Sequence, residues 1–169
     1  MKVFYHNTDG GLFSSPEDAL SKNVDDPSAE LYSILNQLEK YKSGGGFHFR
    51  LCYPELVEKN DGDGCNEWIQ TSNPATDSTI TGFQPISLSF PYNSYLKNWV
   101  GIGKDVSGRG ATFIDDAPNQ SNWWTAIGSY SYHGSSSTIP GPRDQTNNKY
   151  IVQQVELYVN PTGKGCVEK

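Results

Sequence analysis

The stretch "FHFRLCY" (Phe47–Tyr53) marks the point where the chain changes from helical to extended patterning. Phe, Phe, Leu and Tyr stand at every second position, with His48, Arg50 and Cys52 between them. A period of two is that of a strand with one buried face. The glycines 44–46 come immediately before it and end the preceding helical pattern. We therefore expect β structure from Phe47 onward.

Two helices are predicted upstream of this strand. "SPEDALSK" offers Ser15 as an N-cap and Pro16 at the first helical position. "DPSAELYSILNQLEKYKSGGG" repeats the device with Asp26 and Pro27. Apolar side chains then follow at helical spacing up to the glycines, which predicts a second, longer helix. These apolar residues are Leu31, Ile34, Leu35, Leu38 and Tyr41.

Short strands separated by Pro, Gly, Asn and Ser clusters are predicted downstream. Ile86, Leu88 and Phe90 alternate with serines, and an apolar face near the end is interrupted at Gln153. That face comprises Ile151, Val155, Leu157 and Val159. Further short strands are expected at Glu67–Gln70, Trp99–Ile102, Ala111–Ile114 and Trp124–Ile127. The pattern indicates a mainly β fold, either a β-sandwich or a mixed antiparallel sheet, with one or two N-terminal helices.

Composition bounds the class of protein. The 169 residues suit one globular domain, which we place at 1–169, and 17 glycines and 10 prolines favour turn-rich β structure. The net charge is −6 and no Lys/Arg run occurs, so a nucleic-acid partner is not expected. No apolar run approaches the ~20 residues of a membrane span.

The cysteines favour an oxidising compartment. Cys52 and Cys65 flank the polar loop "YPELVEKNDGDG", and a disulfide there adds roughly 3 kcal/mol in the chain-entropy model. The alternative is two unpaired thiols in a reducing compartment. Cys166 is left over, either free, bridging to another chain, or paired with a cysteine elsewhere. Asn119-Gln120-Ser121 is a glycosylation sequon, which fits an extracellular, secreted protein.

Catalytic motifs are missing from the sequence. There is no HExxH, no GxSxG and no P-loop, because Lys104 of "GIGKDVSGRG" precedes Asp105 instead of Ser or Thr. We assign no catalytic residue and expect no enzyme.

Calcium is the candidate cofactor. "NDGDG" carries Asp61 and Asp63 between glycines, and Asp115 and Asp116 form a second acidic pair before Ala-Pro-Asn. Hard cations bind carboxylate and carbonyl oxygens on tightly turning backbone. The alternative for both stretches is an ordinary solvated turn.

The second acidic pair leads into "IDDAPNQSNWWTAIGSYSYHG" (Ile114–Gly134), which holds the candidate ligand site. Neighbouring residues of an extended segment point to opposite faces, so one Trp fills the core and the other is free to stack on a sugar. The phase of Ala126 and Gly128 favours Trp124 as the inner residue. The alternative is that both rings are buried. The candidate ligand-binding residues are Trp123, Trp124, Asn119, Tyr130, Tyr132 and His133.

The order of these motifs resembles the C-terminal part of fibrinogen-related domains. Asp115-Asp116, then Trp123-Trp124, then "VQQVELYVNP" carry the likeness, together with "FHFRLCYPE" and "NEWIQTSN" earlier in the chain. The resemblance covers roughly residues 47–161. It implies an extracellular recognition module in which Asp115 and Asp116 serve calcium, and Trp123, Trp124 and Tyr130 supply aromatic contacts.

Together these patterns predict an extracellular recognition domain whose ligand is a glycan or another matrix component. The alternative is the C-terminal structural module of a larger matrix or collagen-like protein, which directs trimerisation. The leftover Cys166 and the N-terminal helix suit that alternative.

Overall fold

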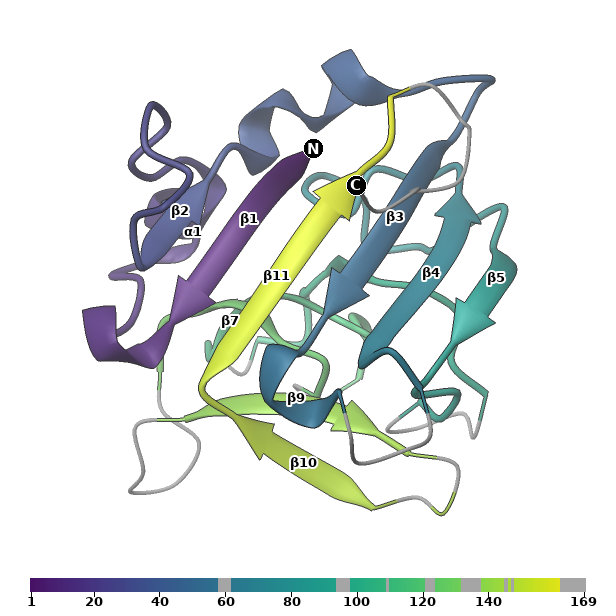
Figure 1. Ribbon diagram of the computed structural model, residues 1–169. Helices are drawn as coiled ribbons and strands as arrows, with labels where there is room; N and C mark the ends of the chain where they lie inside the picture. Colours follow the sequence, from purple (N-terminus) through teal and green to yellow (C-terminus); the bar gives the residue numbers. More distant parts are fainter. Residues whose placement is uncertain are drawn as a thin grey trace.

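The fold is built on one large antiparallel sheet (Figure 1). The computed structural model describes residues 1–57, 62–93, 98–108, 110–120, 124–131, 138–144, 146 and 148–161. Six strands lie in the order β2-β1-β11-β3-β4-β5. They are β1 (Lys2–Asn7), β2 (Leu31–Ser33), β3 (Phe47–Cys52), β4 (Cys65–Gln70), β5 (Gln84–Leu88) and β11 (Gln154–Val159). The expected mainly β fold with few helices is confirmed.

One face of this sheet makes the core. Phe4, Leu157, Leu51 and Asn66 occupy one row across four strands, and all four side chains are buried. Asn66 uses both ends of its amide to hold Phe90, donating to its carbonyl and accepting from its N–H at 2.9 Å each. The residues that alternate with these point to the opposite face of the sheet. One row on that face consists of Tyr5, Glu156, Cys52 and Cys65. The alternation in "FHFRLCY" therefore predicts the right buried face.

The predicted disulfide is present in the second of these rows. Cys52 and Cys65 are direct cross-strand partners of β3 and β4, and their sulfurs are bonded. The bond closes the polar loop that contains the short 3₁₀-helix η3 (Pro54–Leu56). Glu55 in this loop accepts hydrogen bonds from the backbone N–H groups of Gln153 and Gln154. Through Glu55, the disulfide loop thus holds the start of β11 in place.

Shorter elements cover the core face of the large sheet. They form a three-stranded sheet in the order β6-β7-β8 and a two-stranded ribbon of β9 and β10. Their bounds are β6 (Gly103–Lys104), β7 (Thr112–Asp115), β8 (Ile127–Ser129), β9 (Ile139–Arg143) and β10 (Lys149–Val152). Phe90, Trp99, Ile102, Phe113 and Ile127 join residues of the large sheet in one buried cluster. In the part of the chain that is described, no helix is long and apolar enough to cross a membrane.

The first predicted helix is confirmed, and the second is wrong over half its length. In α1 (Pro16–Leu20) the Ser15 hydroxyl accepts from the Asp18 N–H, and proline stands at the first position. In the second stretch, residues 31–33 form strand β2 and only residues 35–41 are helical, as the 3₁₀-helix η2 (Leu35–Tyr41). Pairing of β2 with β1 satisfies the backbone and buries Tyr32 and Ser33 at the edge of the sheet. A further short helix in the described part of the chain is η1 (Thr8–Gly10).

Four strand predictions also need correction. Ile86 is 50% exposed because β5 is an edge strand. Ile151 does not share the face of the β11 residues, because the chain turns at Gln153 from the ribbon into the large sheet. The stretch 99–102 is not a strand, although Trp99 and Ile102 are buried, and β8 begins only at Ile127.

Candidate functional site

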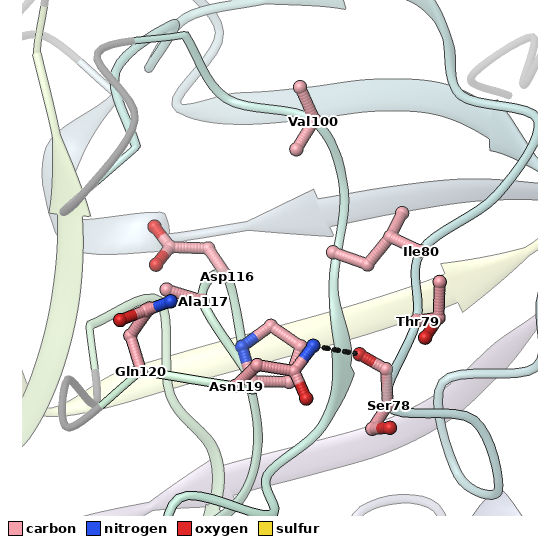
Figure 2. A pocket seen from close by; sticks show the side chains of 9 residues that line it. Ser78, Thr79, Ile80, Val100, Asp116, Ala117, Asn119 and Gln120 are labelled. Carbon is pink, nitrogen blue, oxygen red and sulfur yellow. Dashed lines mark hydrogen bonds between the residues drawn. The ribbon is translucent and has the colours of Figure 1, made fainter.

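A pocket of about 220 Å³ lies where the turn after β7 meets a loop that follows β4 (Figure 2). Its apolar lining comes from four residues on both sides, and its polar lining is made of hydroxyl, amide and carboxyl groups. The apolar residues are Ile80, Val100, Ala117 and Pro118, and the polar ones are Ser78, Thr79, Asp116, Asn119 and Gln120. Asp116 and Asn119 belong to the residues predicted from sequence.

A tight turn forms one wall of the pocket. The N–H of Gln120 donates to the carbonyl of Ala117 at 2.9 Å, and Pro118 takes the second turn position, which its fixed φ suits. Asn119 is exposed at the next position, and its Nδ2 donates to the Ser78 carbonyl at 3.1 Å. Figure 2 shows this bond joining the two walls. The pocket is therefore closed on one side by a side chain of the turn itself.

The other wall is held from the end of β4. Gln70 is fully buried and accepts from the Trp68 indole N–H at 2.8 Å, while its Nε2 donates to the Ile102 carbonyl at 3.0 Å. Gly101, next to the lining residue Val100, has φ 103° and approaches Gln70 so closely that a Cβ would lie 2.7 Å from its Oε1. Such a network fixes the Val100 segment against the rigid sheet.

Asp116 is clamped by three neighbours at the edge of the pocket. Its Oδ2 accepts from the Thr125 hydroxyl at 2.8 Å, and its carbonyl accepts from Asn93 Nδ2. Its N–H donates to the Trp124 carbonyl. Thr125 has φ 56°, which is a rare and costly conformation for a β-branched residue. The strained backbone of Thr125 thus lies at the position from which its hydroxyl reaches the Asp116 carboxylate.

Asp115 faces a different environment from its neighbour. It is fully buried, and burial raises the pKa of its carboxyl to about 9, with further contributions from the negative charges of Asp116 and Asp105. Oδ1 accepts from the Ala117 N–H at 2.8 Å, while Oδ2 has no hydrogen-bond partner among the residues that the structure describes. The carboxyl is therefore protonated at neutral pH. Its bond to Ala117 supports the pocket turn from below.

Trp124 is buried beside the pocket without lining it. The side chain is 9% exposed, and the ring meets two cations of the β9-β10 ribbon. The Arg143 guanidinium carbon lies 5.8 Å from the ring centroid and the Lys149 ammonium 5.2 Å, both within cation–π range. These contacts leave Trp124 poorly placed to stack on a ligand. Trp123, the other predicted ring, lies outside the described residues, as do Tyr132, His133 and Asp61.

The remaining predicted residues lie elsewhere. Tyr130 is half-buried against the core, where burial raises the pKa of its hydroxyl, and it does not line the pocket. Asp63 accepts from Arg50, from the Cys65 N–H and from Ser89, which lowers the pKa of its carboxyl despite partial burial. Among the described residues, no group of three or more His, Cys, Asp and Glu side chains is placed to hold a metal ion.

Sequence reasoning missed the upstream wall and the groups that orient Asp116. Ser78, Thr79 and Ile80 lie in "TDSTITG", a polar run that looks like any surface loop. No sequence motif marks Asn93 or Thr125 as a residue that orients Asp116. The bond between Asn119 and Ser78 spans 41 residues, so local patterns hold no signal for it.

No known family model, curated protein or solved structure matches this chain.

Proposed function

We propose that this chain is an extracellular recognition domain that binds glycan at the pocket between the turn 116–120 and the loop 78–80. The observation that carries the proposal is the pocket's composition. An apolar surface of Ile80, Val100 and Pro118 lies beside amide and hydroxyl groups. Sugars need both kinds of surface, because their C–H faces pack on apolar groups and their hydroxyls pair with polar ones.

The construction of the pocket supports the same proposal. One wall is fixed to β4 through Gln70, and the other is a hydrogen-bonded turn held by Asp115 and Asn119. Binding groups that are already in place lose less conformational entropy when a ligand arrives. The disulfide of Cys52 and Cys65 accords with the oxidising environment of secreted proteins.

The aromatic part of the proposed site is Trp123, which follows the pocket turn in the sequence by three residues. Because Trp124 is buried under Arg143 and Lys149, its neighbour is the residue left to stack on a sugar. The resemblance to fibrinogen-related domains points to the same segment. Calcium at Asp115-Asp116 or Asp61-Asp63 belongs to the proposal as a cofactor that carboxylate oxygens would bind.

A glycan array compares three proteins: the wild type, Thr79→Trp and Ser87→Trp. Thr79 is an exposed lining residue, so a Trp there fills the pocket mouth, while Ser87 is an exposed position on β5. Both variants should keep the wild-type melting temperature. We expect Thr79→Trp to lose binding and Ser87→Trp to keep it.

Equal binding by both variants would show that glycan does not bind in this pocket. Light scattering on the wild type separates the alternative function. A tight trimer that is silent on the array would favour a structural module that assembles a larger matrix protein.

A further inference from the structure

The pocket turn carries the chain's N-glycosylation sequon, Asn119-Gln120-Ser121. Transfer to asparagine requires Ser or Thr two residues later and any middle residue except proline. Asn160 is also followed two residues later by Thr, but Pro161 stands between them. Asn119 is therefore the acceptor that the sequence permits.

The geometry of Asn119 suits an acceptor. The side chain is exposed at the third position of a tight turn, where a transferase can reach it. Its Nδ2 donates to the Ser78 carbonyl, which uses one of the two amide hydrogens. Replacement of the other hydrogen by a sugar leaves an N–H that can still make this bond. Modification is thus compatible with the folded turn.

The same atom lies at the rim of the pocket. Asn119 and Ser78 both line it, and their hydrogen bond joins its two walls (Figure 2). A sugar attached to Nδ2 must start at this rim. With a volume of about 220 Å³, the pocket is no larger than a sugar unit or two, so an attached oligosaccharide is large enough to cover it.

We propose that Asn119 is an N-glycosylation site and that the attached glycan covers the pocket. In the reaction, Asn119 Nδ2 forms a bond to the anomeric carbon of an oligosaccharide carried on a polyprenyl diphosphate. The bond from that carbon to the diphosphate oxygen breaks, and the amide proton is lost to the medium. An attached glycan that covers the pocket also keeps a ligand out of it, and this consequence rests on the proposed function. The modification of Asn119 does not depend on that function.

The first test is mass spectrometry of the full chain secreted from eukaryotic cells. We expect a glycan on the peptide that contains Asn119. Asn119→Gln and Ser121→Ala should each abolish it, and Asn160→Gln should leave it unchanged. A secreted wild-type protein without glycan at Asn119 would overturn the proposal.

The second test measures the covering without any ligand. Thr79→Cys places a thiol at the pocket mouth, and Ser87→Cys places one on β5. Alkylation of Cys at position 79 should be at least about tenfold slower in the glycosylated chain than in the Ser121→Ala background, as for a shielded thiol. The thiol at position 87 should react equally in both. Equal rates at position 79 would overturn the covering. The glycan array is run on the Ser121→Ala chain, whose pocket is not covered, and a negative array there would contradict only the proposed function.

Discussion

Thr125 donates a hydrogen bond to Asp116 over 2.8 Å from a backbone conformation with φ 56°. Thr125→Val keeps the branched shape and the strain but removes the donor from a buried carboxylate. We expect a loss of about 1–3 kcal/mol in the free energy of unfolding, measured by urea denaturation. Thr125→Ser keeps the hydroxyl and should stay close to the wild type. A Val variant as stable as the wild type would show that this bond contributes nothing.

Asp115 should make stability fall as pH rises. Burial raises the pKa of this carboxyl from 3.8 to about 9, so between these values the folded state holds a proton that the unfolded state has lost. The free energy of unfolding should therefore decrease across this range, by at most about 1.4 kcal/mol per pH unit for one proton. Asp115→Asn imitates the neutral acid and should flatten the profile.

His6 has the opposite effect on the pH dependence of stability, and this effect decides the pH range in which Asp115 should be measured. Burial lowers the pKa of its imidazole from 6.5 to about 4, so its contribution to stability is lost as pH falls from 6.5 through 4. The two slopes oppose each other below pH 6.5. Denaturation curves between pH 6.5 and 9 isolate Asp115, and parallel profiles for the wild type and Asp115→Asn would refute its role.

Saturating calcium should raise the melting temperature when either acidic loop binds it, because a ligand that prefers the native state stabilises that state by mass action. Asp115→Ala or Asp61→Ala should remove the shift that belongs to its own loop. Because a cation at Asp115 must displace a proton held with a pKa of about 9, that shift should be larger at pH 8.5 than at pH 6.5. Absence of any shift with millimolar calcium would identify both loops as ordinary turns.

The two adjacent tryptophans should respond differently to truncation. Trp124→Ala removes a buried ring and should cost about 3–5 kcal/mol of stability. Trp123→Ala should leave stability nearly unchanged and abolish glycan binding. Denaturation and the glycan array measure the two effects. If both alanine variants unfold the chain, the pair is structural and the aromatic contact must be sought at another residue.

Local signals predicted those parts of the fold in which neighbours in sequence are neighbours in space. The cap at Ser15 and the alternation through Phe47–Tyr53 are of this kind, and so is the short loop between Cys52 and Cys65. Strand β2 was misread because Leu31 and Leu35 also fit a helical period. Its extended form depends on pairing with β1, which local spacing does not report.

The candidate site divides in the same way. Asp116 and Asn119 lie in one segment and were predicted from it, whereas Ser78, Ile80 and Val100 approach them from other parts of the chain. The strain at Thr125 is equally invisible, since it results from bonds to Asp116 and to the Gly141 carbonyl. Tertiary contacts impose a backbone angle there that threonine itself disfavours.

Strand β11 lies between β1 and β3, and Met1 exchanges backbone hydrogen bonds with Val159, 158 residues away. During synthesis, β1 and β3 therefore leave the ribosome long before the strand that joins them. The large sheet can close only after translation has passed residue 159, so the sheet should form late and slowly for its size. Until then the apolar edges of β1 and β3 are exposed together, which makes the nascent chain a natural client for chaperones.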